Sequence, residues 1–133
     1  RGMARRRITH HDGVSAIQEV LTSGDRTSPT FTTAVRYLLE ELAEVAPGNS
    51  VEVRVPPLGA TQCIEGPRHT RGTPPNVVEM APETLMALSQ NPLKWGELLG
   101  EGLISASGTN ADLSELFVEV SKLVKSFDGG LNG

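Results

Sequence analysis

The chain has 133 residues, a length that one domain accommodates, and 38% of them are hydrophobic, which is enough to build a core. Its single cysteine, Cys63, excludes an internal disulfide and a zinc site made of cysteines, and no apolar run reaches the ~18 residues that a membrane span needs. From Ile8 onward eight basic residues face sixteen acidic ones, a net charge of −8, which argues against a dedicated nucleic-acid binder.

The N-terminal arginines are not followed by the apolar stretch of a secretory signal. We therefore expect a cytoplasmic protein without stable membrane anchoring. Residues 1–11 are predicted to form a disordered basic N-terminus, residues 12–128 a single domain and residues 129–133 a flexible tail.

Two helices are predicted before the first strand. Residues 12–21 have helical apolar spacing, with Asp12 as the expected N-cap. Ser28-Pro29 starts a stronger helix, because the serine hydroxyl can accept a bond from an orphan N–H and the proline has no N–H to lose. The apolar stripe of this helix comprises Phe31, Val35, Leu38, Leu39, Leu42 and Val45, and its charges are predicted to lie opposite, at Arg36, Glu40, Glu41 and Glu44.

Strands are predicted next. Valines alternate strictly with charged residues over 51–55, which indicates a strand with one buried face. A second strand is expected at 59–65, antiparallel to the first across the turn that begins with Pro56-Pro57. Residues 66–75 are predicted to form a loop bounded by glycine and proline.

The stretch from Asn76 to Gly108 is predicted to form a strand, two short helices and a further strand. The first strand covers 77–80, and Asn91-Pro92 separates the two helices. Gly96, inside the second helix, is interpreted as a site of close helix packing. Gly102 ends that helix, and an alternating strand follows at 103–107.

A last amphipathic helix is expected after Thr109-Asn110, which would cap it, and Asp128-Gly129-Gly130 would end it. Its apolar stripe comprises Leu113, Leu116, Phe117, Val120, Leu123, Val124 and Phe127. Strands that cluster early, with helices before and after them, predict an α+β fold with one mixed or antiparallel sheet and helices on one face.

Three segments resemble the sterol carrier protein type 2 superfamily, most closely its small bacterial orthologs, found alone or beside mycothiol-dependent maleylpyruvate-isomerase-like domains. They are the helix leading into the strand 51–55, the strand-to-helix step from Val78 to Leu85, and Gly102–Gly108 with the helix after it. The resemblance covers roughly Phe31 to Phe117 and implies a single sheet of about four to five strands with helices packed on one face.

The resemblance also implies a non-enzymatic lipid-binding and lipid-transport function, with an apolar tunnel between sheet and helices that takes a fatty acyl chain or another apolar small molecule. The residues expected to line the tunnel are Phe31, Val35, Leu85, Leu88, Trp95, Leu98, Leu99, Leu116, Phe117 and Val120. The same periodicity also fits an ordinary packed core, so both interpretations stay open.

The loop 66–75 contains a basic group that could bind an anionic head group outside such a tunnel. It comprises Arg68, His69 and Arg71. The alternative is a solvated loop whose basic side chains pair with Glu65 or Glu79.

Catalytic and metal sites find little support, and we expect neither an enzyme nor a cofactor. Cys63 lies in the middle of a strand, with no third residue to orient His69 as a base. His10 and His11 are adjacent, so their rings would diverge by ~100° on a helix. The rival function is an interaction or accessory domain with a filled core, whose last helix forms a homodimer or docks on a partner such as a mycothiol-dependent maleylpyruvate-isomerase-like protein.

Overall fold

The computed structural model describes residues 8–66 and 74–132, and its order of elements confirms the expected one. Helices α1 (His10–Ser23) and α2 (Pro29–Val45) precede strands β1 (Val51–Val55), β2 (Gly59–Cys63) and β3 (Asn76–Met80). Helix α3 (Pro82–Gln90), a short 3-10 helix η1 (Pro92–Lys94) and helix α4 (Trp95–Gly100) lead to strand β4 (Ile104–Ser107) and the final helix α5 (Ser114–Asn132).

The four strands form one mixed sheet in the order β2-β1-β3-β4. Strands β1 and β2 pair antiparallel, as expected, with Val53 opposite Thr61, whereas β1 and β3 run parallel, with Val53 beside Val78. Strand β4 pairs antiparallel with β3. The α+β prediction, with a single sheet of about four strands, is therefore confirmed.

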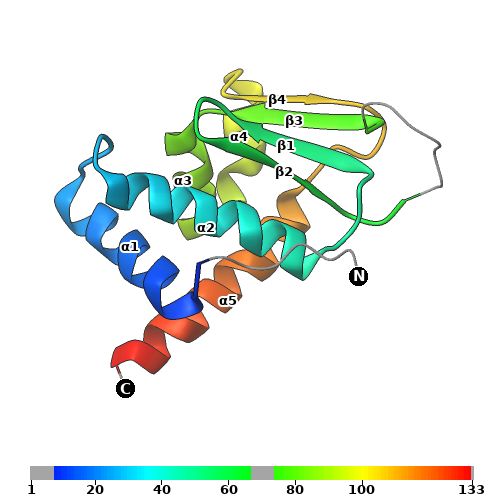
Figure 1. Cartoon of the computed structure of the whole chain (residues 1–133). Coiled ribbons are helices and arrows are strands. Elements are labelled where there is room, and N and C mark those ends of the chain that lie inside the picture. Colours follow the sequence, from blue (N-terminus) through cyan, green and yellow to red (C-terminus); the bar gives the residue numbers. More distant parts are fainter. Residues whose placement is uncertain (1–7, 67–73, 133) are drawn as a thin grey trace.

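The helices gather on one side of this sheet (Figure 1). Helices α2, α3 and α5 contact one another, and α1 packs against α2 and α5 (Figure 1). The valines of β1 are buried, whereas Glu52 and Arg54 point to the other face and are partly exposed. One face of the sheet therefore meets the hydrophobic core, and the other face is polar.

Local capping decides where the first two helices begin. The Ser28 hydroxyl accepts a hydrogen bond from the backbone N–H of Phe31 at 3.3 Å, which confirms the predicted start of α2. In α1 the Thr9 hydroxyl accepts from the backbone N–H of Asp12 at 3.0 Å, so the helix begins at His10 and Asp12 is not the cap. The predicted boundary at residue 12 is thus two residues late.

Strand β2 ends two residues earlier than expected because the backbone turns at Ile64. This residue has a φ of 66°, in the left-handed region that isoleucine rarely adopts. The Ile64 carbonyl accepts hydrogen bonds from the backbone N–H and the hydroxyl of Ser50, at 3.0 and 2.7 Å. These bonds hold the end of β2 against the start of β1.

Two predictions about the last third of the chain are wrong. Helix α5 begins at Ser114, whose N–H donates to the Asp112 carboxylate at 2.9 Å, and not after Thr109-Asn110. It continues through Gly129-Gly130 to Asn132, beyond the expected end.

Within the described part of the chain, no helix combines the length and the hydrophobicity that crossing a membrane requires.

The close approach of two helices occurs at Gly13 and not at Gly96. A β-carbon added at Gly96 would meet no atom within 4 Å among the described residues, so the interpretation of Gly96 as a packing site is wrong. A β-carbon at Gly13 would overlap the ring of Tyr37 on α2. The missing side chain of Gly13 therefore lets α1 lie directly on α2.

Candidate ligand-binding site

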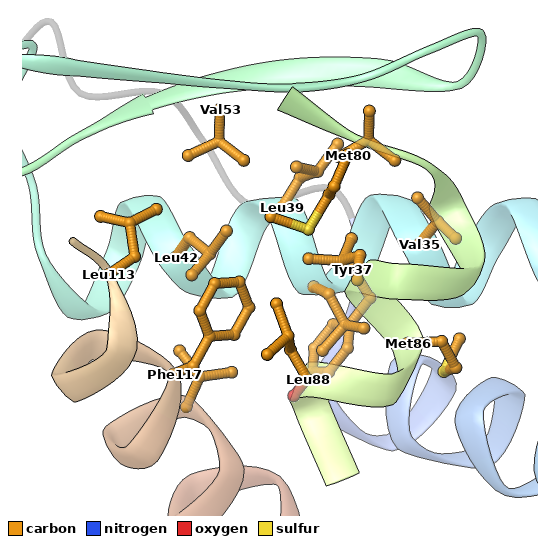
Figure 2. Packing of buried hydrophobic residues seen from close by; sticks show 14 of the residues in the cluster. Val35, Tyr37, Leu39, Leu42, Val53, Met80, Met86, Leu88, Leu113 and Phe117 are labelled. Atoms are coloured by element: carbon orange, nitrogen blue, oxygen red, sulfur yellow. The ribbon is translucent and has the colours of Figure 1, made fainter. Parts of the chain in front are cut away.

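Nine of the ten residues expected to line a tunnel are buried in a single hydrophobic cluster between the helices and the sheet. They come from α2, α3, α4 and α5, and they are Phe31, Val35, Leu85, Leu88, Trp95, Leu98, Leu116, Phe117 and Val120. Figure 2 shows how side chains from several of these elements converge under the sheet, with Phe117 and Leu88 facing Leu42. Their role as a ligand lining stays a prediction.

The tenth residue, Leu99, differs from the others. Its side chain is 42% exposed on α4, and it does not belong to the buried cluster. Helix α4 has only six residues, so the spacing of Leu98 and Leu99 could not settle which of the two faces the core. The structure places Leu98 inside and Leu99 outside.

A groove of about 610 Å³ lies between α2 and the edge strand β2. Its lining includes Ile8, Thr32, Thr33, Arg36, Leu39, Glu40, Leu58 and Thr61. Sequence reasoning missed this groove because its walls come from three separate stretches of chain. The only local signal is Leu39, which belongs to the apolar stripe of α2.

The groove is apolar at its floor and polar at its rim. Leu39 lines the groove and is also buried in the core, where Figure 2 shows it beside Met80. At the rim, the Arg36 guanidinium donates from Nε to the carbonyl of Leu58 at 3.4 Å. The Glu40 carboxylate accepts from the backbone N–H of Ile8 at 3.1 Å. An apolar floor with a few polar groups around it suits an amphiphilic ligand.

A second hollow, of about 440 Å³, lies on the open face of the sheet. Its lining includes Glu52, Arg54 and Glu79 beside the turn at Pro56-Pro57. The Arg54 guanidinium donates from Nε and Nη2 to one oxygen of Glu52, at 3.1 and 2.9 Å. None of the described residues that line this hollow belongs to the hydrophobic cluster, so it is a poorer match for an apolar ligand.

The basic group expected to bind a head group lies outside the described residues, since Arg68, His69 and Arg71 fall in the segment 67–73. Of the described cations, Arg36 is the one that lines the groove.

Cys63 is buried at the end of β2, and burial raises the pKa of its thiol from the ordinary 9.0 to about 11. At neutral pH the thiol therefore stays protonated, which is unfavourable for a nucleophile. The unfolded chain loses this proton above pH 9, whereas the folded protein keeps it up to about pH 11. The resulting contribution to stability is complete below pH 9 and is lost as the pH rises towards 11.

We expect the folded protein to react only slowly with a disulfide reagent such as dithiobisnitrobenzoate at pH 8, because the Cys63 thiol is both buried and protonated. Reaction in urea should be complete within minutes. Rapid stoichiometric labelling of the native protein at pH 8 would contradict the buried, neutral thiol.

A family model described as "Bacterial SCP ortholog" matches residues 25–118, which includes α2, the whole sheet, α3, α4 and the first turn of α5. No curated protein matches the chain. Because the matched segment spans well over half of the sequence, the chain belongs to the family of bacterial orthologs of the sterol carrier protein (SCP).

Proposed function

We propose that the protein is a non-enzymatic carrier of an apolar ligand of the fatty-acyl class, which enters by the groove between α2 and β2 and lies between the sheet and the helices. Family membership supports a sterol-carrier-like module. The observation that carries the proposal is the position of Leu39, which is at once the floor of the groove and part of the core. A fatty acyl chain that displaces the Leu39 side chain would reach the region between the sheet and the helices.

The composition of this region favours such a ligand. The core is mostly aliphatic, and the flexible side chains of Met80 and Met86 lie in it. Methionine side chains repack easily around a guest, so the ligand would need little backbone movement. At the rim, Arg36 offers a guanidinium to a carboxylate head group.

Displacement of a fluorescent fatty acid tests this proposal. Leu58→Glu puts a carboxylate into the groove, and we expect it to weaken binding of the fatty acid by about tenfold or more, because the ligand would have to bury a charge or leave apolar surface exposed. Leu58 is only partly buried, so the variant should fold.

Leu93→Glu is the matched control. Leu93 is 86% exposed in η1 and does not line the groove, so the same substitution should leave the affinity unchanged. Circular dichroism and the melting temperature establish that both variants are folded. Equal affinity of both variants and the wild type for the fatty acid would refute an entrance at the groove.

An interaction module is the second candidate, and one observation favours it. Among the described residues, three of the five exposed large hydrophobic side chains lie between positions 93 and 103, and they are Leu93, Leu99 and Leu103. Phe127, by contrast, stacks on His10 within the same chain, so it is not an exposed anchor for a partner. Light scattering at high protein concentration tests this candidate. A wild-type dimer that dissociates in the Leu93→Glu variant would support it, and a monomeric wild-type protein would refute self-association.

A further inference from the structure

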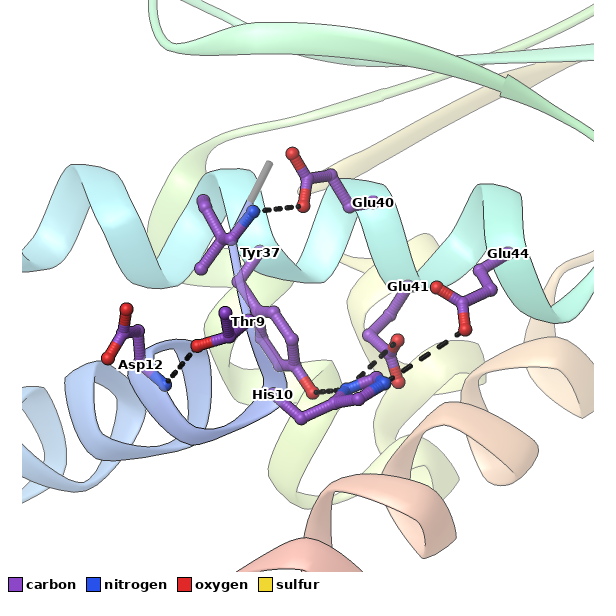
Figure 3. Close-up of polar contacts among 8 residues, drawn as sticks. Thr9, His10, Asp12, Tyr37, Glu40, Glu41 and Glu44 are labelled. Carbon is purple, nitrogen blue, oxygen red and sulfur yellow. Dashed lines mark hydrogen bonds and ion pairs between the residues drawn. The ribbon is translucent and has the colours of Figure 1, made fainter. Parts of the chain in front are cut away.

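A group of three potential metal ligands lies where α1, which precedes the segment that matches the family model, meets α2, which lies inside that segment. His10 is the first residue of α1, and Glu41 and Glu44 lie one turn apart on α2. One ring nitrogen of His10 and one carboxylate oxygen from each glutamate all lie within 4.8 Å of one another. Figure 3 shows the three side chains converging between the two helices.

The His10 ring is held from two other sides. Its Nδ1 atom lies 2.9 Å from the hydroxyl of Tyr37, within hydrogen-bond distance. Its ring stacks on Phe127 of α5, with a centroid distance of 4.0 Å and an angle of 19°. Side chains of α2 and α5 therefore fix the ring, and its other nitrogen, Nε2, lies 4.0 Å from the carboxylate of Glu44 (Figure 3). Histidines that bind metals are commonly oriented through the ring nitrogen that does not bind.

The two glutamate side chains differ in how far they can move. Glu41 is 1% exposed, with Oε1 3.8 Å from His10 Nδ1, so packing fixes its position. Glu44 is 54% exposed and can change rotamer without disturbing the core. The cluster combines two fixed side chains with one adjustable side chain and is open to water on the side of Glu44.

We propose that His10, Glu41 and Glu44 bind one divalent transition-metal ion of the zinc type, with water completing the coordination shell. An imidazole with two carboxylates suits zinc and its neighbours better than magnesium or calcium, which prefer all-oxygen sites. Metal–ligand bonds of ~2.0–2.2 Å require these ligand atoms to close in by roughly 1 Å. The exposed Glu44 side chain supplies most of that movement. Tyr37 acts as a positioning residue for His10.

The ion would join α1 to the family fold. Helix α1 precedes the matched segment 25–118, and the proposed ligands bridge it to α2. A bound ion would therefore stabilise the docking of α1. This inference is independent of the proposed lipid-carrier function, because the cluster does not line the groove.

Isothermal titration calorimetry of untagged full-length protein with zinc chloride tests the site. We expect one zinc ion per chain, with magnesium chloride giving no heat of binding at the same concentrations. His10→Gln and Glu44→Gln should each weaken zinc binding by about tenfold or more, since each removes one ligand. Tyr37→Phe keeps the ring and removes the hydroxyl, and it should weaken binding by about tenfold.

His11→Gln and Glu19→Gln are matched controls, because both residues lie on α1 with exposed side chains outside the cluster. Both controls should bind zinc like the wild type, and zinc should raise the melting temperature of the wild type but not of His10→Gln. Absence of zinc binding at about 100 μM would overturn the proposal. So would a loss of affinity in His11→Gln equal to that in His10→Gln, which would indicate adventitious binding to exposed histidines.

Discussion

Replacing Asn76 by alanine is expected to lower the free energy of unfolding by about 2–4 kcal/mol, because it leaves two backbone groups without their partner. Asn76 is buried at the start of β3, and its side-chain amide donates to the carbonyl of Ser50 at 2.9 Å. Its side-chain oxygen accepts from the backbone N–H of Asn110, also at 2.9 Å. One side chain thus fixes the start of β1 and the segment between β4 and α5. Urea denaturation measures the change.

Asn110→Ala is the control for this prediction. It removes the exposed side chain of Asn110 but keeps the backbone N–H that donates to Asn76. We expect a change within about 0.5 kcal/mol, as at most surface positions. If Asn76→Ala proved as mild as Asn110→Ala, the two hydrogen bonds would not hold these segments together.

Gly13→Ala should destabilise the protein by about 1–3 kcal/mol, because the added methyl group overlaps the buried ring of Tyr37. Helix α1 would have to move away from α2, and His10 would lose its position beside Tyr37. The unfolding free energy from urea denaturation is the readout, and zinc affinity should fall in the same variant.

Gly96→Ala is the matched substitution with the opposite sign. Gly96 lies in α4 with open space at its β-carbon position, so alanine should stabilise the protein by up to about 1 kcal/mol through its higher helix propensity. No destabilisation by Gly13→Ala would contradict the close packing of α1 on α2, and destabilisation by Gly96→Ala would contradict the open space at its β-carbon position.

The features that the sequence predicts correctly are those that depend on residues close together in the chain. Ser28-Pro29 marks the start of α2 by cap chemistry, and the alternation of valines marks β1 and its buried face. The hairpin of β1 and β2 follows from their short connection. The predicted cap at Asp12 failed because the hydroxyl of Thr9, three residues earlier, accepts from the backbone N–H of Asp12 and so places Asp12 inside the first turn of α1.

The features that depend on distant contacts could not be read in this way. The parallel pairing of β1 with β3 joins strands that are separated by β2 and a long connection. Glu41 was expected on the exposed face of α2, but it is buried because α1 packs over that side of the helix. A local signal for it exists, since Glu41 lies three residues after Leu38 and directly before Leu42 in the apolar stripe.

In the candidate site, too, features that depend on local sequence were predicted and features that depend on distant contacts were not. The apolar spacing placed nine side chains in one interior cluster, yet spacing alone cannot distinguish a core from a ligand lining. The groove between α2 and β2 and the cluster around His10 each combine residues from separate elements. Neither could be found before the packing of those elements was known.

Native mass spectrometry of the protein purified from cells, before and after denaturing extraction, tests the carrier function most directly. A carrier should give a reproducible adduct with the mass of a lipid or fatty acid, and this adduct should disappear on denaturation. A clean mass of the ligand-free chain, together with no displacement of a fluorescent fatty acid, would contradict the carrier function and favour the interaction module.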